Sequence, residues 1–539
     1  MKIIDKYKQT CTIGWKIAIV SLVFFLCPVF LVIWSINSDI NLLWIYLATN
    51  VIASISIIYS IGFAKEKLQK IILSLLFVLS IPGNIIVWSN LYITREWMRV
   101  AAFWVVFCTD IRETGEFLSQ FVDIVNIIVF IAYVTVGVFL IVKMKNTKRY
   151  TLKKLANKIF FPLSIISIFI IMIFTYLVSA CPVFAFYHSF AKFIAYNIQI
   201  KNMHCVSNNM QAVECYLEKI PHTFVVVIGE STSLYHQSIY GYGRQTTPYQ
   251  DVLKDKKVLA VYTDVVTPHV STRYSLEKVL SFSNYNEPKK MLTTPNIIDI
   301  TKYNCKTYWI NNQEIKGMWQ SPVSYICAEN ADSLIDIASE TDYPIIDIFG
   351  KVLQDTAKNK VIFIHLKGNH FAYQNRYSKE FEKFNNQYKH DENLYKNATH
   401  LTDEMRKTID EYDNSILFGD YLLHCIIDSL NKTNTSSFVI FFSDHGEELY
   451  EIGKFIGHNS GFTPTQYQYK IPFVIWCSEK YRQEVPEVVI DTSRAYNNED
   501  FIHSLGSLMR LKHPAFDSTR SIFSPCFTPT KRRVEGKEI

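Results

Sequence analysis

Charged side chains are almost absent from long stretches of the first third of this chain. The chain has 539 residues, of which 49% are hydrophobic and 19% charged. Five of its apolar runs each reach roughly 20 residues, the length that a helix needs to cross a bilayer. These runs are 13–34, 42–63, 71–91, 121–142 and 159–179. Their number and length exclude an ordinary soluble core and predict a transmembrane domain of five helices.

The sequence also lacks the basic surface of a nucleic-acid-binding protein. Its formal charge is a modest +6, and no stripe of Lys and Arg alternates with aromatic residues. The first apolar run is too long for a signal peptide and is not followed by a small-residue cleavage site. We therefore expect a membrane-embedded protein with no nucleic-acid partner.

Basic residues are distributed unevenly between the five apolar runs. They gather before the first run, between the second and third, and most densely at 143–158. The connection at 36–41 has none, and the one at 92–120 balances them with acids. Because basic loops stay in the cytoplasm, the N-terminus is predicted to be cytoplasmic and the residues after Ala180 to be exported. We expect a transmembrane domain at 1–180, a connector at 181–220 and an exported domain at 221–539.

Cysteines in the exported part could form disulfides, since that compartment is oxidising. Seven of the eleven cysteines lie there beyond Cys181, which is expected near the outer surface of the membrane. Their separations favour two local pairs, Cys205 with Cys215 and Cys305 with Cys327, although separation does not fix connectivity. Because seven is odd, at least one thiol is expected to stay free or to pair elsewhere.

Short apolar runs alternate with helical patterns after His222. This alternation predicts an α/β domain with a mostly parallel sheet covered by helices. One long helix is predicted at 402–431. The predicted strands are 223–228, 258–262, 307–310, 361–365, 438–442 and 472–476.

Polar residues follow three of these strands. Glu230 follows the first, His370 lies just beyond the fourth, and Asp444 and His445 end the fifth, with His458 thirteen residues later. Parallel strands bring their carboxyl ends to one edge, so these side chains are expected to converge. Solvated polar residues at the end of a strand would explain Asp444 and His445 by themselves. They explain less well why acids and histidines follow three strands. The set exceeds what one zinc needs, which leaves histidines to bind an anion or to transfer a proton.

A hydroxyl nucleophile is predicted where the loop at 266–271 becomes a helix. Ser271 and Thr272 both stand at that point, and either could simply cap the helix. A helix N-terminus also attracts phosphate, and a zinc-bound hydroxyl loses its proton near neutral pH. Spacing alone does not choose between the two residues.

Two segments of the exported part resemble a known family. Gly229-Glu-Ser-Thr-Ser and Tyr240-Gly-Tyr-Gly-Arg-Gln-Thr-Thr-Pro248 are similar to the start of the catalytic domain of membrane phosphoethanolamine transferases. These enzymes belong to the alkaline phosphatase/sulfatase superfamily. The Gly-Asn-His segment, the Ser-Asp-His-Gly-Glu segment and the late histidine follow in the family's order. The resemblance covers essentially the whole chain. It implies a sulfatase-like periplasmic domain anchored in a bacterial inner membrane, and we expect a monomer.

The resemblance implies a role for each site residue. Thr272 matches the nucleophilic threonine. Glu230, Asp444 and His445 match zinc ligands, with the threonine as the fourth. One zinc ion is expected, and the number beyond one is left open.

Five further residues match positions that contact substrate in the family. His370 and His458 match histidines that hold the phosphate or a second zinc. Lys316 matches a lysine near the donor phosphate, and an ordinary solvated surface lysine is the alternative. Thr109 and Glu113 match residues that meet the ethanolamine head group, for which an amphipathic surface helix is the structural alternative.

The activity that the resemblance implies is transfer of phosphoethanolamine from phosphatidylethanolamine to lipopolysaccharide. The phosphoethanolamine passes through a covalent intermediate on the threonine, and the acceptor is a lipid A phosphate or a core sugar. A glycerol-phosphate transferase of the same superfamily, acting on a lipid or glucan, is the alternative. An inactive scaffold is disfavoured because every expected position is filled.

One departure from the family concerns the nucleophile loop. Members that modify lipid A often carry a cysteine pair around the nucleophile, but Pro268 and Lys278 occupy about those positions here. The loop is therefore expected to be held by packing, and the acceptor stays open. The Gly446 position is expected to allow a tight turn, whereas Glu447 and Glu448 receive no role.

Overall fold

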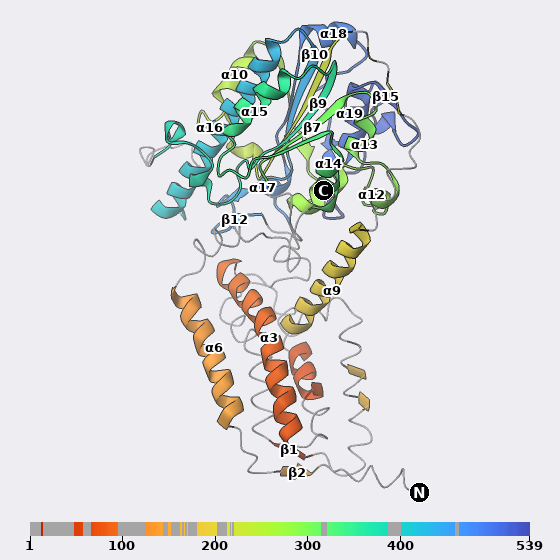
Figure 1. The fold of residues 1–539 in the computed structure, drawn as a ribbon. Helices are drawn as coiled ribbons and strands as arrows, with labels where there is room; N and C mark the ends of the chain where they lie inside the picture. The colour runs from red at the N-terminus through yellow and green to blue at the C-terminus, as the bar shows by residue number, and fades with distance from the viewer. Residues whose placement is uncertain are drawn as a thin grey trace. The chain divides into compact units, whose positions relative to one another are not determined.

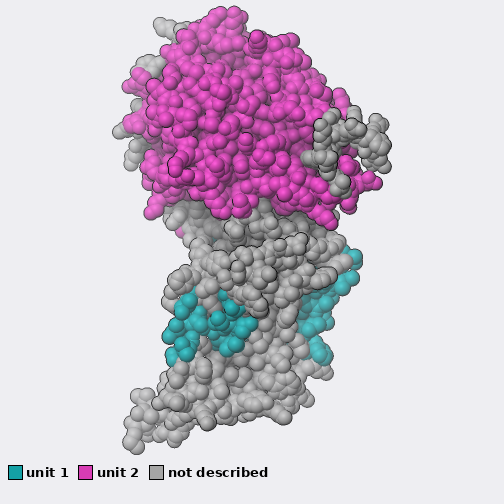
Figure 2. Space-filling view, turned by 180° about the vertical axis from the view of Figure 1, so that it is seen from behind, with its two compact units in different colours: residues 1–107, 117–196 teal, residues 108–116, 197–539 magenta. Residues whose placement is uncertain are grey.

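The chain forms two compact units in a computed structural model (Figure 2). Unit 1 comprises residues 1–107 and 117–196, and unit 2 comprises residues 108–116 and 197–539. The structure describes residues 12–14, 48–57, 66–94, 124–143, 149–151, 162–163, 166–167, 170, 181–201, 213–215, 217, 220–313, 321–385, 400–458 and 463–539.

Unit 1 contains long apolar helices. Helix α3 (Glu66–Thr94) and helix α6 (Ile124–Lys143) coincide with the third and fourth predicted spans. Within the described residues, one helical segment, Lys70–Ser89, is long and apolar enough to cross a membrane by length and composition. The first and fifth predicted spans lie largely outside the described residues, and the second is described only at Ala48–Ile57, which is helical.

Helices α3 and α6 pack through an aromatic contact that also carries a hydrogen bond. Phe77 is buried against Tyr133, and Asn84 Nδ2 donates to the Tyr133 hydroxyl at 2.9 Å. A third helix, α9 (Pro182–Lys201), occupies the beginning of the segment that the sequence predicts as a connector. The connector is therefore helical in its first half.

Two short strands pair the N-terminal segment with the basic loop at 143–158, which the charge pattern places on the same side of the membrane. Strand β1 (Thr12–Gly14) pairs antiparallel with strand β2 (Arg149–Thr151). The pairing agrees with a shared location for these two segments. It also corrects one boundary, because Ile13, expected to begin the first span, is paired with Tyr150 in this strand ladder.

Unit 2 is built on a seven-stranded sheet (Figure 1). Its order is β5 (Leu259–Tyr262), β13 (Phe473–Cys477), β10 (Ser436–Ser443), β4 (His222–Gly229), β9 (Asn359–His365), β7 (Lys306–Asn311) and β8 (Ser333–Asp336). Strands β10, β4, β9, β7 and β8 are parallel, whereas β13 runs antiparallel to both of its neighbours. The predicted mostly parallel sheet is confirmed, with the six predicted strands in place and β8 added at one edge.

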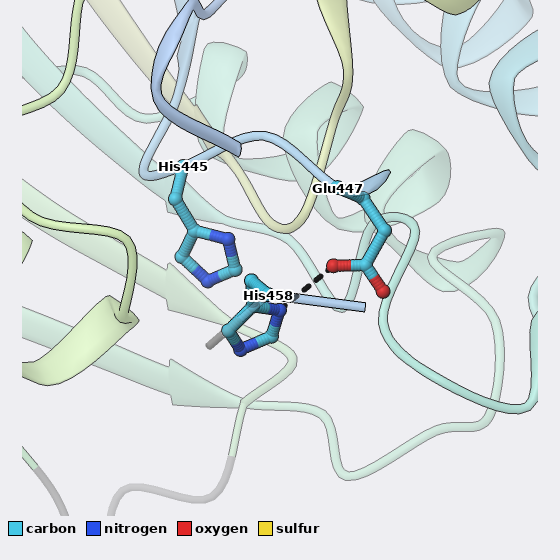
Figure 3. A group of neighbouring side chains, drawn as sticks. All are labelled: His445, Glu447 and His458. Carbon is cyan, nitrogen blue, oxygen red and sulfur yellow. Dashed lines mark hydrogen bonds and ion pairs between the residues drawn. The ribbon is translucent and has the colours of Figure 1, made fainter. Parts of the chain in front are cut away.

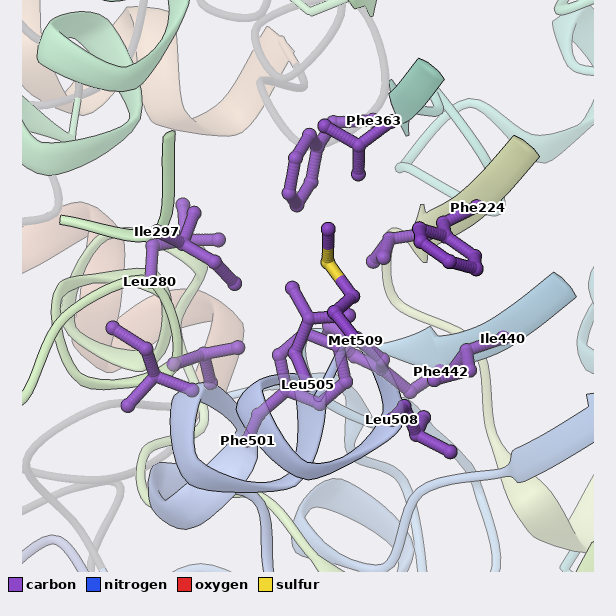
Figure 4. Packing of buried hydrophobic residues seen from close by; sticks show 14 of the residues in the cluster. Phe224, Leu280, Ile297, Phe363, Ile440, Phe442, Phe501, Leu505, Leu508 and Met509 are labelled. Atoms are coloured by element: carbon purple, nitrogen blue, oxygen red, sulfur yellow. The ribbon is translucent and has the colours of Figure 1, made fainter. Parts of the chain in front are cut away.

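Both faces of the sheet are covered by helices, which explains the continuous apolar runs of its strands. Phe224 of β4 packs in one cluster with Leu505 (Figure 4), and Ile228 belongs to the same cluster. Val225 and Val227 point the other way and pack against a second cluster. Helices α11 (Thr272–Val279), α13 (Ile297–Thr301), α14 (Pro322–Asn330) and α19 (Phe501–Leu508) supply the first cluster, and α15 (Pro344–Leu353) and α16 (Asp403–Asn431) supply the second (Figure 1).

The predicted disulfide between Cys305 and Cys327 is wrong. Both thiols are free and buried in the first cluster, where they pack as small apolar side chains. Burial raises the pKa of Cys305, which keeps its thiol protonated. Cys215 is also free, and its Sγ donates to the Met509 carbonyl at 3.4 Å. Its expected partner, Cys205, lies outside the described residues.

Removing a side chain at the centre of the sheet should destabilise unit 2. Ile440 is fully buried, so Ile440→Ala is expected to cost about 2–5 kcal/mol of unfolding free energy. The matched control is Ile490→Ala, at a residue that is 40% exposed, with an expected change within about 0.5 kcal/mol. Thermal unfolding followed by circular dichroism measures both, and equal losses would contradict the packing described here.

Candidate metal centre

The register between two parallel strands places two carboxylates side by side. Ser443 of β10 pairs with Gly229 of β4, so the next residue on each strand, Asp444 and Glu230, leave the sheet at the same level. The Asp444 N–H donates to the Gly229 carbonyl at 3.0 Å and extends the ladder by one bond. Both acids are buried, with 1% or less of each exposed. The predicted convergence at the carboxyl edge is therefore present.

Thr272 joins the two carboxylates from the start of helix α11. Its Oγ1 donates to Glu230 Oε2 at 3.0 Å and lies 3.3 Å from His445 Nε2. Ser271 is the N-cap residue of this helix, but its side chain makes no capping hydrogen bond. The geometry thus brings the threonine hydroxyl into the cluster, a choice that spacing left open.

The spacing of these atoms fits a tetrahedral metal site. His445 Nε2 lies 3.3 Å from Glu230 Oε1 and 3.4 Å from Asp444 Oδ2. A tetrahedron with metal–ligand bonds of about 2.0 Å has edges of about 3.3 Å, which matches these separations. Two carboxylates, an imidazole and a hydroxyl also form the hard N/O donor set that zinc accepts.

One carboxylate oxygen of Asp444 faces the cluster, and the other is held in place by hydrogen bonds. Its Oδ1 accepts the Ser231 N–H at 3.2 Å and the His445 N–H at 2.7 Å. Its Oδ2 is buried and accepts no hydrogen bond from any described residue. A buried carboxylate oxygen without a donor is costly, and a cation at this point would satisfy it.

Electrostatics also favour a cation between the two acids. Burial and the neighbouring charge of Glu230 raise the pKa of Asp444 well above its ordinary range. Burial acts to raise the pKa of Glu230 too, but the hydrogen bond and charge of His445 lower it well below that range. Without a cation, Asp444 therefore retains a proton that a divalent ion would displace.

His445 is oriented by its other ring nitrogen. Its Nδ1 lies 2.9 Å from the Gly446 carbonyl, so Nδ1 carries the donated proton and Nε2 faces the cluster. Gly446 is needed for a reason other than the expected tight turn. A Cβ there would lie 2.3 Å from the Tyr467 carbonyl oxygen, so close backbone approach excludes any side chain.

His458 is held beside this cluster by Glu447, a residue to which the sequence gives no role. His458 Nδ1 lies 2.7 Å from Glu447 Oε2 (Figure 3). The Tyr373 hydroxyl donates to Glu447 Oε1 at 2.6 Å. The ring centroids of His445 and His458 are 4.0 Å apart. His445, Glu447 and His458 form a second group that could hold a metal ion. The only sequence signal for Glu447 is its place in the loop that carries the first ligands.

His370 reaches the site through a loop that packs directly on Glu230. Asn369 N–H donates to the Glu230 carbonyl at 3.0 Å. Gly368 has φ +54°, and a Cβ there would lie 2.8 Å from the Glu230 nitrogen, so no side chain fits. Burial lowers the pKa of His370 well below its ordinary value, which keeps the imidazole neutral. Lys316, Thr109 and Glu113 lie outside the described residues.

A buried ion network borders the site on the side of helix α16 and was not expected from the sequence. His236 Nδ1 lies 2.7 Å from Asp413 Oδ1, and its Nε2 lies 3.2 Å from Glu451 Oε1. Arg244 NH1 pairs with Asp413 at 2.7 Å and with Asp410 at 2.8 Å. Arg244 belongs to the Tyr240–Pro248 segment, so that motif ties the loop after β4 to the helix.

Comparison with known proteins relates more than half of the chain, including most of unit 2, to one family. The sulfatase family profile matches residues 222–511. The phosphoethanolamine transferase EptC of Escherichia coli O18:K1:H7 (strain RS218 / NMEC) is 34% identical over 325 residues, which cover 58% of this chain and 55% of that protein. The chain thus spans about half the length of the curated relatives that it matches first.

Two solved structures share the fold. One is the zinc complex of the C-terminal periplasmic domain of EptC from Escherichia coli, with 32% identity and a TM-score of 0.56. That match covers 60% of this chain and 91% of the domain. The other is the integral membrane lipooligosaccharide phosphoethanolamine transferase A (EptA) from Neisseria meningitidis, with 19% identity and a TM-score of 0.67. It covers 96% of this chain and 99% of that protein, so the likeness in fold includes unit 1.

Zinc binding should depend on the charge of Glu230. Glu230→Gln keeps the shape of the side chain but leaves the cluster with one carboxylate. The zinc dissociation constant is expected to rise by more than the roughly tenfold to hundredfold effect of losing an outer-shell partner. Isothermal titration with Zn²⁺ measures this, and the exposed Glu479→Gln on α18 (Glu479–Glu484) is the matched control. Equal affinities in the two variants would exclude this cluster as the metal site.

The His236 network should stabilise unit 2 in a pH-dependent way. Burial alone would lower the pKa of His236, but the charges and hydrogen bonds of Asp413 and Glu451 raise it from 6.5 to about 9. The stabilisation is fully present below pH 6.5 and is lost as pH rises through about 9. His236→Gln should therefore lower the melting temperature most at acidic pH, with the difference shrinking at alkaline pH. A difference that stays constant across this window would contradict a charged His236.

Proposed function

Because this chain belongs to the sulfatase family, we propose that it is a metal-dependent phosphoethanolamine transferase. The resemblance to the phosphoethanolamine transferases that the motifs predict is confirmed. In this proposal phosphatidylethanolamine is the donor and lipopolysaccharide the acceptor, on a lipid A phosphate or a core sugar. The observation that carries it is the Thr272 hydroxyl, 3.0 Å from Glu230 and 3.3 Å from His445 at the start of a helix.

The metal-binding residues in the proposal are Glu230, Thr272, Asp444 and His445. A zinc ion bound there supplies Lewis-acid polarisation and lowers the pKa of the threonine hydroxyl. In the structure Thr272 Oγ1 already donates its proton toward Glu230 Oε2, so the oxygen's lone pairs point away from that carboxylate. The positive end of the helix dipole at the start of α11 favours the donor phosphate beside it.

The first step transfers the phosphoethanolamine group to the protein. Thr272 Oγ1, which would have released its proton to solvent when zinc binds it, attacks the phosphorus atom in line, and the bond from phosphorus to the diacylglycerol oxygen breaks. The leaving oxygen needs a proton. His458 is placed to give it from Nε2, because Glu447 holds Nδ1 at 2.7 Å. The products of the step are diacylglycerol and phosphoethanolamine esterified to Thr272.

The second step moves the group to the acceptor. An oxygen of lipopolysaccharide attacks the same phosphorus, and the bond to Thr272 Oγ1 breaks, so that this oxygen leaves as the alkoxide with which the first step began. His370 or His458 can take the proton of an acceptor hydroxyl, and burial keeps His370 neutral for that task. Lys316 is proposed to contact the donor phosphate, and Thr109 and Glu113 the ethanolamine head group, whose ammonium suits a carboxylate.

The proposed location is a bacterial inner membrane. The N-terminus would be cytoplasmic, residues 1–180 would form five spans, and residues 221–539 would form a periplasmic domain behind a connector at 181–220. Exposed apolar side chains along α3 and α6, among them Leu75, Val78 and Ile131, support contact with lipid. Membrane spans suit an enzyme whose donor and acceptor are both lipids, and we propose that it acts as a monomer.

Mass spectrometry of the peptide containing Thr272 tests the covalent step. After incubation with phosphatidylethanolamine, this peptide should gain the mass of one phosphoethanolamine group, and Thr272→Ala should abolish the gain and the activity. Ser271→Ala is the matched control, because Ser271 adjoins Thr272 yet its hydroxyl makes no capping bond, and it should leave the modification in place.

Two other results would change the assignment. An unmodified peptide in protein that transfers phosphoethanolamine would exclude the covalent route. Labelling from a glycerol-phosphate donor instead of phosphatidylethanolamine would replace the proposed function with glycerol-phosphate transfer. Mass spectrometry of lipopolysaccharide from cells with and without this protein then identifies the acceptor.

A further inference from the structure

The segment that precedes the proposed nucleophile is fastened to the metal centre on its inner side. The Thr267 hydroxyl lies 2.5 Å from the Asp444 carbonyl oxygen, and the Ser275 hydroxyl donates to the same oxygen at 2.8 Å. Thr267 N–H also donates to the Tyr469 carbonyl at 2.9 Å. Residues on both sides of Thr272 are thus tied to one carbonyl group.

On its outer side the same segment lies against Glu535, whose Oε1 is 3.7 Å from His269 Nδ1, and its main hydrogen-bonded attachment is the Pro268 carbonyl oxygen. It accepts the Tyr285 hydroxyl at 2.6 Å and the Glu535 N–H at 3.0 Å. Both donors come from outside the loop, one from the segment after α11 and one from far along the chain. Burial raises the pKa of Tyr285, so its hydroxyl keeps the proton that it donates.

Tyr285 also holds the far end of helix α11. The Lys278 ammonium lies 4.5 Å from the centroid of the Tyr285 ring, within the range of a cation–π contact. One tyrosine therefore links Pro268, which precedes the nucleophile, to Lys278 in the last turn of the helix that begins with it. Pro268 and Lys278 occupy about the positions of the cysteine pair that surrounds the nucleophile in members modifying lipid A. In this chain the two positions are linked by non-covalent contacts with Tyr285.

The second donor sits in a tight hairpin formed by β16 (Arg533–Val534) and β17 (Lys537–Glu538). Its turn residues, Glu535 and Gly536, have φ of 51° and 79°, as a two-residue turn of the primed type requires. The Asn497 side chain donates to the Arg533 carbonyl at 3.2 Å, and Val534 is 1% exposed. The hairpin lies beyond residues 222–511, which the family profile matches.

We propose that Tyr285 and the Glu535 turn form a clamp on the Pro268 carbonyl that positions Thr272 for attack. This proposal rests on the proposed function, in which Thr272 is the nucleophile. Neither clamp residue touches the reacting atoms, so both are positioning residues. The ligands Glu230, Asp444 and His445 follow strands β4 and β10 and do not depend on the clamp.

The clamp matters for rate because an attacking oxygen displaced by a fraction of an ångström loses much of its alignment. The inner anchor fixes one side of the loop, and the clamp fixes the other. Loss of the clamp should therefore lower kcat while the metal stays bound and KM changes little.

Tyr285→Phe tests the hydroxyl donor, because it removes that group and keeps the ring that Lys278 contacts. With full-length protein in mixed micelles of detergent and phosphatidylethanolamine, kcat should fall about tenfold, while KM and the zinc dissociation constant stay within about twofold. Hydrogen exchange at residues 269–272 should become faster, and exchange in β10 should not change. Tyr303→Phe, at a tyrosine that is 46% exposed, is the control and should match the wild type.

Two variants at Glu535 test the other donor. Glu535→Gln keeps the N–H, the positive φ and the length of the side chain that lies 3.7 Å from His269, so it should behave as the wild type. Glu535→Pro removes the N–H and cannot adopt that φ, so it should reproduce the loss of kcat. The clamp is overturned if Tyr285→Phe and Glu535→Pro modify Thr272 at the wild-type rate, or if their activity falls only in step with lost zinc. A wild-type protein that never becomes modified at Thr272 would overturn the proposed function instead.

Discussion

Two buried carboxylates, Glu230 and Asp444, are kept side by side by the hydrogen bonds between strands β4 and β10. Backbone register alone sets their separation, because Ser443 pairs with Gly229 and each acid is the next residue. Like charges in a buried place repel, so this arrangement is costly unless a proton or a cation lies between them. The surroundings supply compensation from one side, through His445 and two N–H donors to Asp444 Oδ1. Asp444 Oδ2 lies 3.4 Å from His445 Nε2 but accepts no hydrogen bond from a described residue, so it is available to a metal.

The rest of the site is arranged around that pair. Helix α11 begins where its first hydroxyl reaches both Glu230 and His445, and the loop after β9 packs its glycine on the Glu230 backbone. The long helix α16 contributes through the network of His236, which anchors the loop after β4 from behind. Backbone hydrogen bonds and close backbone contacts therefore fix the positions of the loops in the site. The titratable side chains take their positions from these loops.

Much of this could be predicted from the sequence, and the limits have physical causes. The buried strands were predictable because burial on both faces leaves an unbroken apolar run, as in β4 and β10. Strand β8 was missed because this edge strand, with three partly buried residues and one exposed residue, has no such run. Glu230, Asp444 and His445 were predictable because parallel strands bring their exits together, whereas Glu447 was not, since adjacent acids in a loop give no sign of which one turns inward. Cys305 and Cys327 were wrongly paired because separation in sequence carries no information about how helix α14 packs.

The carbonyl group of Asp444 has a consequence of its own for how this site can change over time. Its side chain belongs to the candidate metal centre, while its carbonyl oxygen receives the hydroxyls of Thr267 and Ser275. A carbonyl is present whatever the side chain, so sequence drift at position 444 could abolish metal binding and still leave the neighbouring loop folded. A related protein that has lost metal binding could thus keep the same fold. The residue at position 444 would then distinguish it from an active protein.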